Sequence, residues 1–108
     1  MARILVVDDM PAVVALLRVA LEDAGHVVTE ARDGAGCLAL LRSAPFDVVV
    51  LDMMMPGLDG IETVKRLRAE GLGVAVIAMS GGTEDFPAAV SLKMSEMHGA
   101  DRLLFKPF

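Results

Sequence analysis

Acidic, hydroxyl and ammonium side chains follow four of the five short apolar runs in this chain. Asp8 and Asp9 come directly after the first run, Asp52 after a middle one, Ser80 after the next and Lys106 after the last. If the runs are parallel strands, their carboxyl ends share one edge of a sheet, where such sheets bind ligands. Three carboxylates held together repel one another unless a cation neutralises them, and Mg²⁺ prefers such oxygen ligands together with phosphate oxygens. The pattern therefore indicates a divalent-cation site that also handles phosphate.

Lys106 and Ser80 supply the other half of a phosphate site. A lysine ammonium offers a positive point charge and a serine hydroxyl offers a hydrogen-bond donor, and the oxygens of a phosphoryl group accept both. A carboxylate in the same place can attack phosphorus and form an aspartyl phosphate. These residue types thus predict Mg²⁺-assisted phosphoryl transfer to one of the aspartates.

The apolar runs predict the strands that must position these side chains. Most of them are continuous stretches of Val, Ile, Leu and Ala bounded by turn residues, which is typical of strands covered on both faces. Such strands form a parallel sheet between two layers of helices. The predicted strands cover residues 4–7, 27–31, 48–51, 74–79 and 103–105.

A first helix is predicted between the first two strands. Pro11 suits its first turn, and Gly25 stands just past its end. Apolar residues recur with the helical period along this segment and indicate one buried face. The predicted buried stripe is Val13, Leu16, Leu17, Ala20, Leu21 and Ala24.

Three further helices complete a three-layer, doubly wound α/β sandwich in a single domain, residues 1–108. A short second helix follows Asp33-Gly34, and a third follows Asp59, whose spacing to Glu62 is that of a capping box. The fourth is predicted over residues 86–97. The stripe of the second helix contains Leu38 and Leu41, and that of the third contains Ile61, Val64 and Leu67.

The composition excludes several classes of function. The 108 residues carry a formal net charge of −5 and are 55% hydrophobic, so one aliphatic core is expected and disorder is not. The acidic balance argues against the basic face that direct nucleic-acid binding needs. No apolar stretch reaches the roughly 18 residues of a membrane span, so no membrane association is expected. The single Cys37, interpreted as a core residue, fits a reducing cytoplasm.

Four segments together resemble the receiver domain of two-component response regulators, and the resemblance covers the whole chain. These segments are residues 6–9, residues 50–60, Ser80 and residues 105–108. The resemblance implies a flavodoxin-like fold with strand order 2-1-3-4-5. It also implies that a histidine kinase or a histidine phosphotransfer protein donates the phosphoryl group, that slow hydrolysis removes it, and that an output partner, which the sequence does not identify, responds.

By the same resemblance, Asp52 is the phosphoacceptor. Asp9 would bind Mg²⁺ directly, Asp8 would bind it directly or through a water molecule, and the backbone carbonyl of Met54 would complete the protein ligands. Asp8 and Asp9 read alone could equally cap the first helix, because aspartate accepts hydrogen bonds from free N–H groups there.

The resemblance implies that Ser80 and Lys106 hold the phosphoryl group after transfer. The Lys106-Pro107 bond is expected to be cis, and Pro56-Gly57 is expected to form a tight turn beside the site. The new charge would then shift the loop after the fourth strand and the fourth helix between two arrangements.

The sequence departs from the family pattern in two places. Leu103 stands where the family usually has the aromatic ring that couples to the hydroxyl of the Ser80 position, so aromatic switching is not expected here. The sequence also stops after the fifth strand, without a fifth helix. We expect it to be a piece cut after that strand; the alternative is a natural minimal receiver that covers the open sheet edge by forming a homodimer.

Three other functions fit parts of the pattern. A receiver-like adaptor that binds partners without phosphorylation would have no use for Asp9, Asp52 and Lys106 together. A phosphatase with an aspartyl nucleophile should carry a second Asp two residues later, where this chain has Met54. A flavin-nucleotide binder needs a phosphate loop after the first strand, where Asp8 and Asp9 would repel phosphate.

Overall fold

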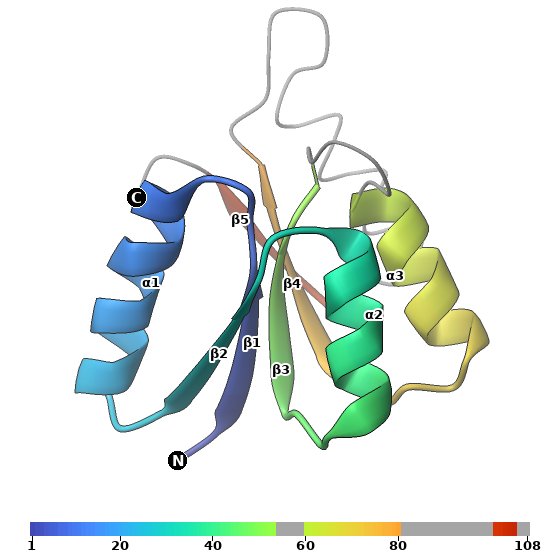
Figure 1. The fold of residues 1–108 in the computed structure, drawn as a ribbon, viewed down its shortest axis with the longest axis horizontal. Coiled ribbons are helices and arrows are strands. Elements are labelled where there is room, and N and C mark those ends of the chain that lie inside the picture. Colours follow the sequence, from blue (N-terminus) through green and yellow to red (C-terminus); the bar gives the residue numbers. More distant parts are fainter. Residues whose placement is uncertain (54–59, 81–100, 106–108) are drawn as a thin grey trace, which may run out of the picture.

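The computed structural model describes residues 1–53, 60–80 and 101–105, which form a five-stranded sheet flanked by three helices (Figure 1). The described elements follow the predicted strand–helix alternation, and the predicted fourth helix over residues 86–97 lies outside the described residues. Along the chain the elements are β1 (Arg3–Val7), α1 (Pro11–Asp23), β2 (Val27–Ala31), α2 (Gly34–Ser43), β3 (Val48–Asp52), α3 (Gly60–Ala69), β4 (Ala75–Ser80) and β5 (Arg102–Phe105).

All neighbouring strands are parallel, and the sheet order is β2-β1-β3-β4-β5. This order confirms the one that the resemblance implied. Parallel neighbours cannot be joined by tight hairpins, and α1, α2 and α3 each lie between two successive strands in the chain and cover the faces of the sheet (Figure 1). In Figure 1, α1 lies on one face and α2 and α3 lie on the other.

The two faces of the sheet are buried in separate hydrophobic clusters. Because side chains alternate along a strand, Leu5 and Val7 of β1 pack with α2 and α3, whereas Ile4 and Val6 pack with α1. All four are buried, which explains why the strand reads as a continuous apolar run. The cluster beneath α2 and α3 includes the predicted stripe residues Leu38, Leu41, Val64 and Leu67, with Ile61 at its margin.

The predicted stripe of α1 is partly wrong. Leu17 and Leu21 pack against the sheet as predicted, but Leu16 is 51% exposed, and Ala20 and Ala24 are also exposed. The fully buried position is Val14, which the predicted stripe did not include. Apolar side chains occur on nearly every side of this helix, so the helical period alone did not determine which side faces the sheet.

Pro11, Gly25 and Gly71 lie at helix ends as predicted, and Asp59 of the predicted capping box lies outside the described residues. Pro11 occupies the start of α1, and the side chain of Asp33 accepts a hydrogen bond from the backbone N–H of Gly36 at the start of α2. Gly25 and Gly71 have φ angles of 90° and 73°, which favour glycine, and they follow α1 and α3. None of the described helices is long and apolar enough to cross a membrane.

The amino end of β5 is tied to β4 through Asp101. One carboxylate oxygen of Asp101 accepts hydrogen bonds from the backbone N–H of Val76 and from Arg68, each at 2.8 Å. Arg68 also donates to the carbonyl oxygens of Leu72 and Val74. These contacts fix the position of the edge strand at the end of the sheet opposite the predicted site.

Gly60, the first residue of α3, lies directly against the end of β3. A Cβ atom at this position would lie 2.5 Å from the carbonyl oxygen of Asp52 and 2.5 Å from the Cα of Met53. Both atoms belong to the backbone, so a side chain at residue 60 can be accommodated only if β3 and α3 move apart. Glycine therefore permits the contact that positions the backbone of Asp52.

We predict that Gly60→Ala lowers the free energy of unfolding by about 2 kcal/mol or more, because the added methyl group has no space. The matched control is Gly73→Ala, where an added Cβ meets nothing within 4 Å. Urea unfolding of both variants checks the prediction. Equal stability of the two variants would contradict the prediction, because the close approach of Gly60 to Asp52 would then not affect the free energy of unfolding.

Cys37 on α2 is fully buried in the cluster beneath α2 and α3, which confirms its interpretation as a core residue. Burial raises the pKa of its thiol from an ordinary value of 9.0 to about 12. Because the thiolate is the reactive form, three units correspond to a thousandfold smaller ionised fraction below pH 9.

We predict that Cys37 of the native protein reacts with a disulfide reagent at pH 8 at least about a hundredfold more slowly than in the urea-unfolded protein. Absorbance of the released thiol measures both rates. Similar rates in the two states would contradict the burial of this thiol.

Candidate functional site

The carboxyl ends of β1 and β3 are hydrogen-bonded neighbours. The register pairs Val7 with Leu51, so the residues that follow, Asp8 after β1 and Asp52 at the end of β3, emerge at the same edge of the sheet. One carboxylate oxygen from each of Asp8, Asp9 and Asp52 lies within 4.8 Å of the other two. The predicted clustering of these three carboxylates is therefore observed.

The three aspartates differ in their surroundings. The residues Asp8 and Asp52 are 1% and 3% exposed, whereas Asp9 is exposed. The N–H of Asp8 donates to the carbonyl oxygen of Ala31 at 3.2 Å, and its Oδ1 accepts from the N–H of Met10 at 2.9 Å. Asp8 is thus fixed between the end of β2 and the loop that leads to α1.

The alternative interpretation of Asp8 and Asp9 as helix caps does not describe this geometry. The residue at the cap position of α1 is Met10, and no side chain caps the helix there. Its carbonyl oxygen accepts from Val13 and Val14 within the first turn. The acidic pair therefore lies ahead of the helix, where it faces Asp52.

The three carboxylates fit a small divalent cation. Mg²⁺ binds oxygen atoms at about 2.0–2.1 Å in an octahedron, so its ligand oxygens lie about 3–4 Å apart. The observed spread of up to 4.8 Å needs only a small contraction to reach this arrangement. The donor set contains oxygen alone, which suits Mg²⁺ and not the softer zinc or copper ions. Asp8, Asp9 and Asp52 are the described residues that could hold the ion.

The remaining predicted site residues are only partly described. Ser80 is the last residue of β4 and pairs in register with Phe105, and Leu103 pairs with Ala78. The backbone of Ser80 thus lies at the edge that carries the aspartates, two strands from β1. Met54, Pro56, Gly57, Lys106 and Pro107 lie outside the described residues.

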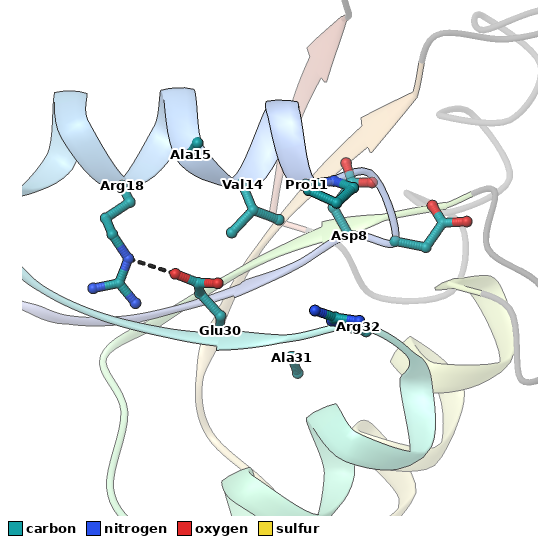
Figure 2. Close-up of a pocket in the computed structure, with 9 residues that line it drawn as sticks. Asp8, Pro11, Val14, Ala15, Arg18, Glu30, Ala31 and Arg32 are labelled. Atoms are coloured by element: carbon teal, nitrogen blue, oxygen red, sulfur yellow. Dashed lines mark hydrogen bonds and ion pairs between the residues drawn. The ribbon is translucent and has the colours of Figure 1, made fainter.

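A cleft of about 350 Å³ opens beside the acidic cluster, between α1 and the end of β2 (Figure 2). Asp8 and Asp9 line it at one end, and Pro11, Val14 and Ala15 of α1 form one wall. Glu30, Ala31 and Arg32 line it from β2, and Arg18 of α1 reaches across to Glu30.

The prediction from sequence did not include this cleft or Arg32. The sequence did contain an indication of Arg32, because this residue directly follows the second strand. With Arg32 included, a polar residue stands at the carboxyl end of all five strands. Arg18 and Glu30 gave no signal, because their contact depends on the packing of α1 against β2.

Comparison with known proteins gives one consistent result. The family model of the response regulator receiver domain matches residues 4–108. The alkaline phosphatase synthesis transcriptional regulatory protein PhoP of Bacillus subtilis is 39% identical over 106 residues, which cover 98% of this chain and 42% of PhoP. The transcriptional regulatory protein TcrA of Mycobacterium tuberculosis is 39% identical over 107 residues, 98% of this chain and 40% of TcrA.

Solved structures agree with the sequence relatives. The chemotaxis response regulator CheY4 of Vibrio cholerae matches with a TM-score of 0.88 and 32% identity, covering 100% of this chain and 88% of that one. The response regulator TrrA of Thermotoga maritima, solved in complex with Mg²⁺-BeF, matches with a TM-score of 0.81 and 30% identity, covering 100% and 89%.

The chain spans 40–45% of the length of the curated relatives that it matches. Three findings point to the same family: the order of the five strands, the acidic cluster at the carboxyl ends of β1 and β3, and the match over residues 4–108. The chain belongs to the response regulator receiver domain family, the signalling domains of two-component phosphorelays.

Proposed function

We propose that this domain accepts a phosphoryl group on Asp52 from a histidine kinase or a histidine phosphotransfer protein, in a Mg²⁺-dependent reaction. The observation that carries the proposal is the cluster of Asp8, Asp9 and Asp52, with carboxylate oxygens within 4.8 Å of one another. Three like charges this close repel one another, and a cation together with a phosphoryl group would use all three.

Asp52 is the best candidate for the nucleophile because of its place in the sheet. It ends β3, the central strand, and its backbone pairs with Met79 and contacts Gly60. A nucleophile on a fixed strand end attacks in one orientation, which lowers the entropic cost of transfer. Asp8 and Asp9 come from the neighbouring strand end and are the residues proposed to hold Mg²⁺.

The proposed step is an exchange of bonds at phosphorus. A carboxylate oxygen of Asp52 forms the new O–P bond, and the P–N bond of a phosphohistidine breaks, its electron pair staying on the nitrogen. Mg²⁺, when bound, supplies positive charge that stabilises the oxygens of the transferring group. Water later hydrolyses the aspartyl phosphate and restores Asp52.

The proposal includes roles for residues whose side chains the structure does not describe. Ser80 and Lys106 would hold the phosphoryl oxygens, which is supported by the pairing of Ser80 with Phe105, the residue before Lys106. The carbonyl of Met54 would add a Mg²⁺ ligand. The tight turn at Pro56-Gly57, the cis bond at Pro107 and the absence of an aromatic switch at Leu103 stay predictions.

The partners of this chain are likewise proposed. A kinase or phosphotransfer protein would approach the edge of the sheet that carries the aspartates, in the cytoplasm, where the free thiol of Cys37 fits. Several relatives are named as DNA-binding response regulators, so we propose that an output domain reads the phosphorylated surface and that this domain itself does not contact DNA. A homodimer through the edge of the sheet at β5 stays a prediction.

A phosphorylation-independent adaptor is the alternative function. It would use the surface of the same fold but would gain nothing from the acidic cluster. The two functions differ in whether Asp52 takes up phosphorus, which a mass measurement decides.

We predict that incubation with acetyl phosphate and Mg²⁺ adds the mass of one phosphoryl group to the intact protein. Asp52→Asn should abolish the addition, because its amide is not a nucleophile. Asp23→Asn, the same change at an exposed residue at the end of α1, should leave the addition unchanged. Removal of Mg²⁺ with a chelator should also prevent it.

Two results would contradict the proposal. The first is no mass addition in protein whose folding is confirmed by cooperative urea unfolding, which would favour the adaptor. The second is an addition that persists in Asp52→Asn, which would place the phosphoacceptor elsewhere.

A further inference from the structure

Arg32 occupies a defined position beside the acidic cluster. It follows Ala31, the last residue of β2, and the carbonyl of Ala31 accepts the hydrogen bond from the N–H of Asp8. Arg32 is exposed and lines the cleft of about 350 Å³ together with Asp8 and Asp9. Figure 2 shows it at the end of β2, below Asp8.

Two arginines line this cleft, and they differ in their partners. Arg18 pairs with Glu30 across the cleft and with Glu22 on its own helix. Among residues 1–53, 60–80 and 101–105, Arg32 forms no hydrogen bond or ion pair. Arg32 is therefore the cation of the cleft whose donors are available to a ligand.

The charges around the cleft limit what that ligand can be. Asp8, Asp9 and Glu30 all line it and the charge of Arg18 is paired with Glu30, so an anion would be attracted mainly close to Arg32. A guanidinium presents parallel N–H donors that match the two oxygens of a carboxylate. A cleft of this volume suits a small molecule.

Acyl phosphates are small molecules, and they carry the carboxyl group that the guanidinium of Arg32 would bind. Transfer of their phosphoryl group releases a carboxylate, and the transition state of phosphoryl transfer is loose, so negative charge develops on the leaving oxygen. A cation placed beside that oxygen stabilises the transition state more than the ground state.

We propose that Arg32 is a specificity-determining residue that binds the leaving carboxylate of small acyl phosphates and so favours them over phosphodonors whose leaving group is neutral. This rests on the proposed phosphorylation of Asp52. The O–P bond to Asp52 forms, the P–O bond of the acyl phosphate breaks, and its electron pair stays on the carboxylate oxygen that Arg32 binds. With phosphoramidate the P–N bond breaks and the electron pair leaves on ammonia, which offers Arg32 no charge.

The experiment compares acetyl phosphate and phosphoramidate as donors at saturating Mg²⁺, with second-order rate constants measured from intact mass. For Arg32→Ala we expect the constant for acetyl phosphate to fall about tenfold and that for phosphoramidate to stay within about twofold. Arg32→Lys should fall between wild type and Arg32→Ala, because lysine keeps the charge but loses the paired donors.

Arg3→Ala is the matched control. Arg3 starts β1 at the opposite end of the sheet and is exposed, so its removal changes the net charge equally without touching the cleft. Both rate constants of this variant should equal those of wild type. The ratio of the two constants, not either alone, is the quantity that a general effect on folding would leave unchanged, and Arg3→Ala measures how much net charge alone changes it.

The outcomes separate this inference from the proposed function. Equal falls for both donors in Arg32→Ala, or no change for either, would overturn the role of Arg32 while Asp52 remains the phosphoacceptor. If wild type accepts phosphorus from neither donor, the proposed function itself fails. Urea unfolding and the Mg²⁺ dissociation constant check each variant, and if Arg32→Ala does not fold, the donor ratio of Arg32→Lys decides.

Discussion

The register between β1 and β3 forces three carboxylates into one small volume. Because Val7 pairs with Leu51, the backbones of Asp8 and Asp52 cannot move apart without breaking the ladder between two buried strands, and Asp9 directly follows Asp8. Like charges within 4.8 Å cost free energy wherever water is partly excluded, and Asp8 and Asp52 are both buried. The fold keeps the three carboxylates close together although they repel one another, and a bound cation would attract all three.

The packing around the aspartates explains how the fold remains stable although their carboxylates repel one another. Both faces of β1 and β3 are buried, so the strands that carry the aspartates lie at the most stable part of the domain. Gly60 brings α3 against the backbone of Asp52, and Ala31 holds the backbone of Asp8. Rigid strand ends keep the site organised before any ligand arrives, which is what catalysis by positioning requires.

Strand positions and the acidic cluster could be predicted from sequence, because both depend on local patterns. The run over residues 27–31 is β2 as predicted, and strand ends in a parallel sheet must share an edge. The strand order came only from the resemblance, since periodicity does not encode it. The buried side of α1 was mispredicted at Leu16, and the cleft with Arg32 was missed, because both depend on how α1 packs against β2.

Mg²⁺-dependent stability tests most directly whether the strand ends form a cation site whose carboxylates repel one another when no ion is bound. Urea unfolding of wild type and Asp9→Asn should be measured with and without saturating Mg²⁺. Without the ion, Asp9→Asn should be more stable than wild type by about 1 kcal/mol or more, since one repulsive charge is removed. Mg²⁺ should stabilise wild type and have much less effect on the variant. If Mg²⁺ leaves wild type unchanged, or stabilises both equally, the three carboxylates do not form a cation site.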